Sequence, residues 1–277
     1  MTLELEDHDF SLFKEPEDFR PPPPEPKVVT FERKADHISS GIRRLPKTID
    51  ESTYYIGFHP LWAHQLWNAS KCLSWYLDEH KDLVSNKNVL ELGAGGALPS
   101  FISFLNGAKK VVITDYPDND LIENIKYNVQ MNLTLKDDCD ISNIKILGYL
   151  WGSHVGPLLD VISSSQQNSQ SMNKRPLYDL IILSDLIFNH SQHSALLKTC
   201  EECLEIENGQ VLVFFTHHRP CLAYKDMEFF EKAEANGLFK VEKILETVMK
   251  PMFEKDRGSD IVRATVHGYR MIRQKNK

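Results

Sequence analysis

Short apolar runs alternate with amphipathic segments along most of the chain. Five of these runs predict strands, at residues 88–92, 110–114, 144–147, 178–184 and 210–215. Apolar side chains that recur at three- and four-residue steps predict helices at residues 62–83, 98–106, 120–131 and 193–204. Because apolar residues fill consecutive positions in most of the predicted strands, they suit a parallel sheet that is buried on both faces. The alternation therefore predicts an α/β fold, with helices on both faces of a mostly parallel sheet.

Near the end of the sequence, two further strands are expected at residues 240–248 and 262–272, on either side of a charged turn at 254–259. A polar, low-complexity stretch at residues 163–175 interrupts the path to the fourth strand, and we expect it to be a mobile surface insertion. The sequence thus predicts one α/β domain over residues 51–277 that carries this insertion.

Residues 1–50 are expected to form an arm that precedes the domain. Four consecutive prolines at residues 21–24 predict extended polyproline II structure, because each ring fixes φ and removes a backbone donor. The arm is either a disordered tail or a segment that lies along the domain. Apolar side chains at Phe10, Leu12, Phe13 and Phe19 favour the docked alternative, since a pure linker seldom carries so many of them.

Composition and charge narrow the class of protein. Of the 277 residues, 42% are hydrophobic and 26% are charged, which is enough apolar content for a sizeable core. A net charge of −7 argues against a dedicated nucleic-acid binder and is compatible with a basic substrate. No apolar run reaches the roughly 20 residues that span a bilayer, so we expect no membrane association. The first residues lack the features of a secretory signal, so we expect a cytoplasmic protein whose five cysteines are reduced.

The first predicted strand leads directly into the glycine-containing loop Gly93-Ala94-Gly95. Glycines at a strand-to-helix turn let the backbone approach a ligand closely. Asp115 stands twenty positions after Gly95, at the end of the second strand, where a carboxylate accepts hydrogen bonds from ribose hydroxyls. The pair favours an adenosine-containing ligand, but it does not distinguish NAD from S-adenosylmethionine.

Three details favour S-adenosylmethionine. Leu98 occupies the position of the third glycine that a dinucleotide-binding loop requires for close packing. Glu91 lies two residues before Gly93, and a carboxylate near the loop suits a cationic sulfonium and amino group better than a pyrophosphate. With the two additional strands near the end of the chain, the number of predicted strands is greater than one half of a dehydrogenase fold requires.

Several motifs resemble a known family. Residues 90–95, 114–118, 149–152 and 183–190 look like the seven-β-strand protein methyltransferases called methyltransferase family 16. More narrowly, residues 12–24, 60–69 and 217–220 resemble the fungal elongation factor 1-alpha N-terminal and lysine methyltransferases. The resemblance implies a seven-stranded, Rossmann-like class I methyltransferase with an antiparallel C-terminal strand. It also implies S-adenosylmethionine as cofactor and elongation factor 1-alpha as the protein substrate.

The resemblance further implies which residues bind the cofactor: Trp62, Gly93, Ala94, Gly95, Asp115, Trp151 and Ser184. Trp151 follows the third strand, where its indole would stack on adenine. Ser184 ends the fourth strand, at the carboxyl edge where open α/β sheets bind ligands. Filling of the hydrophobic core is the alternative role for either tryptophan.

Candidate substrate-side residues follow the fourth and fifth strands: Asp185, Asn189, His190, His217 and His218. Asp185 would orient an amine through its carboxylate, with a structural hydrogen bond as the alternative. His217 or His218 would accept a proton near neutral pH, unless they are ordinary loop histidines. The pairs His190/His193 and Cys200/Cys203 lack further ligands at metal-site spacing, so no metal is expected.

These observations lead to a protein methyltransferase that acts on the N-terminal glycine and then the adjacent lysine of elongation factor 1-alpha. Deprotonating the acceptor at pH 7 costs about 1 kcal/mol for an α-amine and about 4.6 kcal/mol for a lysine. An N-terminal amine therefore needs little assistance. The alternatives are a methyltransferase for a small amine such as nicotinamide, a non-catalytic scaffold with this fold, and an NAD-dependent dehydrogenase. We expect the protein to act as a monomer.

Overall fold

The computed structural model describes residues 28–33, 48–52, 65–134, 140–163, 176–235, 237–253 and 255–274. Trp62, the four arm residues Phe10, Leu12, Phe13 and Phe19, and the polar residues 164–175 lie outside the described residues, so their predictions stay untested.

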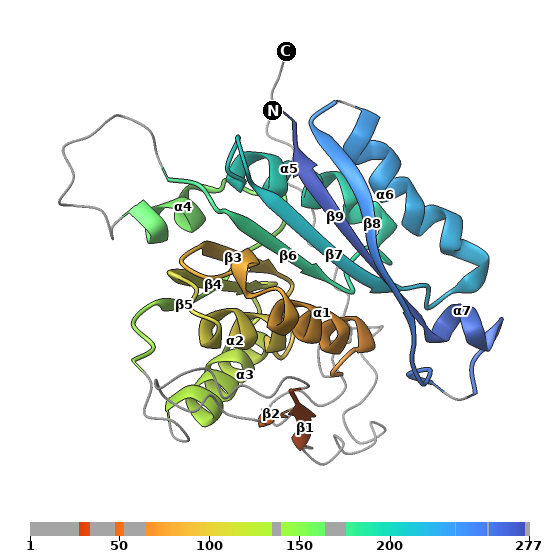
Figure 1. Ribbon diagram of the computed structural model, residues 1–277, viewed down its shortest axis with the longest axis horizontal. Helices are drawn as coiled ribbons and strands as arrows, with labels where there is room; N and C mark the ends of the chain where they lie inside the picture. The colour runs from red at the N-terminus through yellow and green to blue at the C-terminus, as the bar shows by residue number, and fades with distance from the viewer. Residues whose placement is uncertain are drawn as a thin grey trace, which may run out of the picture.

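Seven strands form one sheet, in the order β5-β4-β3-β6-β7-β9-β8 (Figure 1). Their bounds are β3 (Asn88–Leu92), β4 (Lys110–Asp115), β5 (Ile144–Gly148), β6 (Leu180–Ser184), β7 (Gln210–Thr216), β8 (Phe239–Val248) and β9 (Thr265–Arg273). Strands β3 to β7 pair in parallel, whereas β9 is antiparallel to both of its neighbours, β7 and β8. The prediction of a mostly parallel sheet with an antiparallel C-terminal strand is confirmed.

The apolar strands are buried because side chains leave the sheet alternately on its two faces. In β3, Val89 and Leu90 are both fully buried and belong to different hydrophobic clusters. Leu90 lies between Val112 of β4 and Ile181 of β6 in the sheet register. A strand at this position needs apolar residues at consecutive positions, which explains the continuous runs in the sequence.

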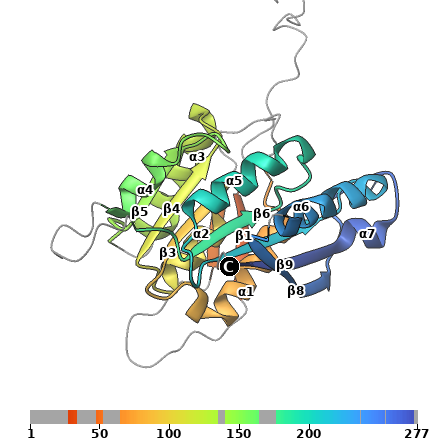
Figure 2. The same ribbon diagram turned by 90° about the horizontal axis from the view of Figure 1, so that it is seen from above.

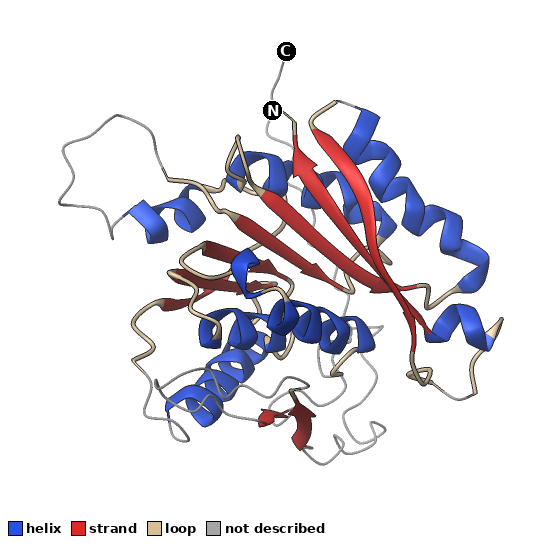
Figure 3. Ribbon diagram, viewed as in Figure 1, coloured by secondary structure: helices blue, strands red, loops and turns tan. Residues whose placement is uncertain are grey.

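Helices cover both faces of the sheet (Figures 1, 2 and 3). One face packs against α1 (Asn68–Glu79), α2 (Leu98–Leu105) and α3 (Asn119–Val129), which continues as a π-helical turn, Gln130–Thr134. The other packs against α4 (Gly156–Ser163), α5 (His193–Cys203) and α6 (Ala223–Ala235). Short 3-10 turns occur at η3 (Lys81–Leu83), η6 (His190–Gln192) and η7 (Pro220–Leu222). None of the helices within the described ranges has the length and apolarity required to cross a bilayer.

The structure corrects the expected C-terminal strand, which begins at Thr265 and not at residue 262. Residues Asp260–Ala264 form the short helix α7 instead. Arg263 is buried there and donates hydrogen bonds to the carbonyls of Phe253 and Asp256, while pairing with Asp260 one turn earlier. These contacts favour a helical turn over an extended chain. Helices α4 and α6 were also absent from the sequence prediction.

A second, two-stranded sheet forms within the segment expected to be the arm. Strands β1 (Val28–Glu32) and β2 (Thr48–Ser52) pair antiparallel, beside α3 at the bottom of Figure 1. Phe31 is buried in the core on the α1 side, with its ring 5.5 Å from that of Trp75. The Trp75 indole donates a 3.0 Å hydrogen bond to the Glu32 carbonyl. This part of the arm therefore lies against the domain.

Candidate functional site

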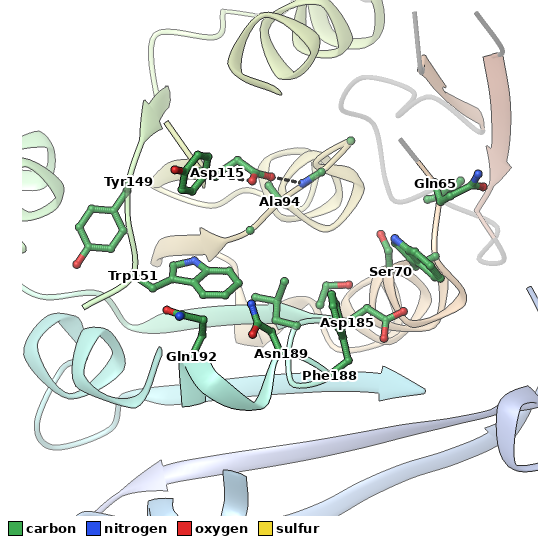
Figure 4. A pocket seen from close by; sticks show the side chains of 18 of the residues that line it. Gln65, Ser70, Ala94, Asp115, Tyr149, Trp151, Asp185, Phe188, Asn189 and Gln192 are labelled. Atoms are coloured by element: carbon green, nitrogen blue, oxygen red, sulfur yellow. Dashed lines mark hydrogen bonds between the residues drawn. The ribbon is translucent and has the colours of Figure 1, made fainter. Parts of the chain in front are cut away.

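A cavity of about 300 Å³ opens at the carboxyl edge of the parallel strands. The loops that follow β3, β4, β5 and β6 line it, together with the start of α1 (Figure 4). Its volume is that of a site for a small molecule. The lining residues that carry the argument below are Trp67, Gly93, Gly95, Asp115, Trp151, Ser184, Asp185 and Asn189.

The loop after β3 depends on glycine at two positions. Gly93 and Gly95 have φ angles of +61° and +55°, which side chains with a Cβ rarely adopt. A Cβ at Gly93 would lie 2.7 Å from Leu186 Cδ2 and 2.9 Å from Trp151 Cζ2. The missing side chain thus lets Trp151 and Leu186 close over the loop.

Asp115, at the end of β4, is held by two backbone donors. Its Oδ2 accepts a 2.7 Å hydrogen bond from the N–H of Gly95, and its Oδ1 accepts one of 2.7 Å from Tyr116. Only 6% of the residue is exposed, yet it lines the cavity. A carboxylate oxygen has further acceptor capacity, so this fixed carboxylate can receive the hydroxyls of a ribose.

Trp151 and Ser184 complete this part of the cavity. In Figure 4 the Trp151 indole lies on the same side as Asp115, where it offers an aromatic surface to a planar base. Within the described part of the chain, the buried Ser184 hydroxyl has no hydrogen-bond partner. An orphaned hydroxyl at a cavity wall suits a polar group of a ligand. The cradle at Gly93, the carboxylate of Asp115 and this hydroxyl together fit an adenosyl amino acid.

Glu91 was expected to lie near a cationic ligand, but the structure buries its side chain away from the cavity. Its side chain is fully buried, and its Oε2 accepts hydrogen bonds from the backbone N–H of Ser100, at 3.1 Å, and from the Ser100 hydroxyl. It is not among the residues that line the cavity. The carboxylate thus supports the first turn of α2 under the loop, where a negative charge is favourable near a helix N-terminus.

Asp185 lies at the opposite end of the cavity from Asp115 (Figure 4). It follows β6 with a φ of +60°, a left-handed conformation that is uncommon for a non-glycine residue. The Nε2 of His218 lies 3.0 Å from each of its carboxylate oxygens, and the N–H of Thr216 lies 3.3 Å from Oδ1. Burial lowers the pKa of His218, but the charge and hydrogen bonding of Asp185 outweigh burial and raise it overall.

The other predicted substrate-side residues divide into two groups. Asn189 lines the cavity. His190 and His217 do not line it; their Nε2 and Nδ1 atoms each lie 2.6 Å from one oxygen of the Asp226 carboxylate. Asp226 is buried in α6, so this bridge joins α6 to η6 and to the end of β7. A catalytic role for either histidine stays a prediction.

The residue pairs considered for a metal have other partners. His193 bonds through Nε2 to the Ile187 carbonyl at 2.7 Å. Cys200 and Cys203 lie on α5 and are fully buried in the core. Within the described ranges, no group of three histidine, cysteine, aspartate or glutamate side chains is arranged to hold a metal ion.

Sequence reasoning missed several residues that line the cavity: Gln65, Trp67, Ser70, Phe188 and Gln192. Trp67 is the most informative of them, because its ring meets the His218 ring edge-on at a centroid distance of 4.7 Å. It stood inside the predicted helix, whereas the structure places it just before α1, at the N-cap. Trp67 belongs to the motif at residues 60–69 that resembles the fungal methyltransferases, but a helix prediction alone does not show that Trp67 faces a cavity.

Comparison with known proteins finds similar sequences over most of the chain. The sequence model of a family described as lysine methyltransferase matches residues 59–236. The protein N-terminal and lysine N-methyltransferase efm7 of Schizosaccharomyces pombe is 44% identical over 95% of this chain and 94% of its own length. The protein of the same name from Candida glabrata is also 44% identical, over 94% of each chain.

Two solved structures share the fold at low sequence identity. The crystal structure of SMU.776 complexed with SAH has a TM-score of 0.53 at 13% identity, covering 81% of this chain and 53% of that one. YcgJ from Bacillus subtilis has a TM-score of 0.52 at 10% identity, covering 74% of this chain and 99% of that one. At these identities the likeness establishes the architecture alone.

Proposed function

The chain belongs to the lysine methyltransferase family, and on that premise we propose that it methylates the N-terminal α-amine and a lysine of a protein substrate. S-adenosylmethionine is the cofactor of this methyltransferase. Both relatives described above are named as protein N-terminal and lysine N-methyltransferases, and they align over nearly the whole chain. The observation that carries the proposal is the placement of the buried Asp185 carboxylate across the cavity from Asp115.

The residues at the Asp115 end fit the cofactor. Gly93–Gly95 would cradle its methionine part, Asp115 would hold the ribose, and Trp151 would stack on the adenine. The Ser184 hydroxyl would find the partner that it lacks among the described residues. When bound, the cofactor supplies a methyl group on a positively charged sulfur.

The residues at the Asp185 end would receive the acceptor amine. The Asp185 carboxylate can orient an amine by accepting its N–H groups. Trp67 and Phe188 add apolar surface beside it, which limits the access of water. Methyl transfer is an in-line displacement, so alignment of a neutral amine with the methyl carbon supplies much of the rate. An α-amine reaches the neutral state more readily than a lysine because its pKa is lower.

We propose elongation factor 1-alpha as the protein substrate, with its N-terminal glycine and then the adjacent lysine as acceptors. The support is the resemblance of residues 12–24, 60–69 and 217–220 to the enzymes that act on this factor. The net charge of −7 is compatible with a basic acceptor segment. A translation factor as substrate also supports a cytoplasmic location, and we propose that the enzyme acts there as a monomer.

The test is incubation of the full chain with labelled S-adenosylmethionine and elongation factor 1-alpha in three forms. These have a free N-terminus, an acetylated N-terminus, or arginine in place of the adjacent lysine. We expect label on the α-amine of the first and third forms and none on that of the second. Methylation that is unchanged by acetylation would contradict the N-terminal assignment. Turnover of nicotinamide without any protein acceptor would favour the small-amine alternative.

A further inference from the structure

Asp185 and His218 form a pair of which only Asp185 lines the cavity. Asp185 lines the cavity, whereas His218 is not among the lining residues and contacts both carboxylate oxygens through Nε2. The exposed fraction of the Asp185 side chain is 3%, and that of His218 is 20%. Because Nε2 of His218 is 3.0 Å from both carboxylate oxygens, the imidazole fixes the plane of the carboxylate.

Three elements hold this pair together. Asp185 follows β6, and its backbone N–H donates a 2.7 Å hydrogen bond to the Phe214 carbonyl of β7. His218 follows β7, and its N–H bonds to the Thr216 carbonyl. Trp67, which precedes α1, packs edge-on against the imidazole. The imidazole therefore has little freedom to leave the carboxylate.

The charges around His218 favour its protonated form. Asp185 and Asp226 raise its pKa, while Arg219 and burial lower it, and the net direction is upward. Asp226 lies on α6, and Arg219 is the next residue in the chain, with its guanidinium bonded to the Phe188 carbonyl. The pair at the end of the cavity therefore combines a carboxylate with an imidazole whose positively charged form is favoured relative to that of an ordinary histidine.

An isolated carboxylate at this position would work against the reaction. A negative charge within about 4–6 Å of an amine favours the ammonium form and raises its pKa, by about 1–3 units where such pairs have been characterised. An ammonium has no lone pair, so it cannot form the new N–C bond while the S–C bond of the methyl donor breaks. The acceptor must release one proton to solvent before transfer, and the methylated ammonium that forms must release another before a second transfer.

We propose that His218 is a positioning residue that orients Asp185 and offsets its negative charge, so that the carboxylate holds the acceptor amine without fixing it as ammonium. This inference rests on the proposed function, since it assumes an amine acceptor at Asp185. The two residues then have different roles. Hydrogen bonds from the amine to the Asp185 carboxylate orient the amine, while the positive charge of His218 keeps the pKa of the amine low. It also explains why His218 needs no contact with the substrate.

The experiment compares three variants with the wild type, using elongation factor 1-alpha with a free N-terminus and measuring kcat and KM between pH 6.5 and 9.5. His218→Gln keeps an N–H donor towards Asp185 but removes the positive charge. His218→Leu removes both. The control is His80→Gln, the same change at an exposed histidine at the C-terminal end of α1. Thermal unfolding of each protein separates folding defects from site effects.

We expect His218→Gln to lower kcat at pH 7 about tenfold, with a KM that is unchanged or lower, because the uncompensated carboxylate holds the ammonium form more tightly. The deficit should disappear by pH 9, so that the pH profile of kcat moves upward by about one unit. His218→Leu should lose activity at every pH, because the carboxylate is no longer oriented. His80→Gln should match the wild type.

Two outcomes for His218→Gln would overturn the inference: a pH profile that superimposes on that of the wild type, or an equal loss of kcat at every pH in a protein with normal thermal unfolding. The wild-type measurement distinguishes this failure from failure of the proposed function. If the wild type transfers no methyl group to a free N-terminus, the proposed function is wrong and the inference falls with it. If the wild type is active and either outcome is seen, only the role of His218 is wrong.

Discussion

The backbone N–H of Gly95 lies 2.7 Å from Asp115 Oδ2, which ties the loop after β3 to the end of β4. The second oxygen of the carboxylate accepts the N–H of Tyr116. Both contacts lie within the protein, so the loop and the carboxylate are aligned before a ligand arrives. A site prepared in this way loses less conformational freedom on binding. The cofactor end of the cavity is therefore preorganised by a contact between neighbouring parallel strands.

The first prediction concerns the charge of Asp115. Replacing Asp115 by asparagine keeps the shape of the side chain but removes the negative charge that accepts the ribose hydroxyls. Hydrogen bonds to charged groups are about 1 kcal/mol stronger than neutral ones, so the Kd for S-adenosylmethionine should rise about fivefold. Isothermal titration calorimetry measures the change. Asp82→Asn, at an exposed aspartate of η3, is the matched control and should bind like the wild type. An unchanged Kd for Asp115→Asn would remove Asp115 from the cofactor site.

The second prediction concerns space at Gly93. Alanine at this position meets both an unfavourable positive φ and the side chains of Trp151 and Leu186 at under 3.0 Å. The left-handed conformation alone costs about 1–2 kcal/mol, and displacement of the two side chains adds about 1–3 kcal/mol. We expect Gly93→Ala to lower the free energy of unfolding by more than the conformational cost and to weaken cofactor binding, because Trp151 must move.

Gly237 provides the control for this substitution. Its φ is +65°, close to that of Gly93, but nothing in the described part of the chain lies within 4 Å of a Cβ added there. Gly237→Ala should therefore show only the conformational cost of about 1–2 kcal/mol and no change in cofactor affinity. Urea unfolding and calorimetry on both variants test the comparison. Equal effects of the two substitutions would mean that the close packing over Gly93 contributes nothing.

The sequence predicted the central strands well because their burial on both faces demands consecutive apolar residues. Helix α6 lacked such a signal. Its buried positions, Asp226, Phe229, Phe230 and Ala233, recur at three- and four-residue steps, but the first of them is a charged residue. Strand β1 is a five-residue element whose burial depends on contacts with α1, such as that between Phe31 and Trp75. Local patterns do not contain such distant contacts.

The two ends of the cavity differ in how far the sequence determined them. Gly93 and Asp115 follow successive strands, and adjacent parallel strands end at the same edge, so their proximity was predictable. The pairing of Asp185 with His218 was not, since it depends on the register that sets Ser184 opposite Phe214. A shift of that register would have brought a different histidine to the carboxylate. Sequence reasoning named both histidines as proton acceptors, and the structure places His218 against Asp185 and His217 against Asp226.

The third prediction concerns the contact that fastens the arm. Arg33 pairs with Asp78 of α1 through two hydrogen bonds, and Asn106 contacts both residues. Both members of the pair are 3% exposed. Removing one member of a buried ion pair leaves the other charge uncompensated, which costs about 3–5 kcal/mol. We expect Arg33→Ala to lower the free energy of unfolding by that amount, measured by urea denaturation.

An exposed ion pair supplies the comparison for Arg33. The Nζ of Lys126 lies 2.7 Å from the Oε1 of Glu123, both on α3, and about half of each side chain is exposed. Lys126→Ala should cost at most about 1 kcal/mol, because solvent screens the pair. If Arg33→Ala lowers the free energy of unfolding by no more than Lys126→Ala does, the contact between the arm and α1 contributes little to the stability of the domain. Asp78→Asn tests the same contact from the other side and should be comparably destabilising.

The fourth prediction concerns stability at acid pH. Burial lowers the pKa of His193, and this effect outweighs the bond to the Ile187 carbonyl, which raises it. The unfolded chain therefore binds a proton at this histidine at a higher pH than the folded protein does. Stability attributable to neutral His193 is complete above the unfolded pKa of about 6.5 and declines as the pH falls below it, by at most about 1.4 kcal/mol per pH unit.

His193→Gln removes this titration, so its free energy of unfolding should fall less steeply than that of the wild type between pH 6.5 and 5. His218 contributes the opposite dependence, because its raised pKa gives stability that is present at low pH and lost as the pH rises. Since His218 is present in both proteins, the difference between their urea-denaturation curves isolates His193. His80→Gln should keep the wild-type slope. A His193→Gln variant with the same slope would show that His193 titrates equally in the folded and unfolded states.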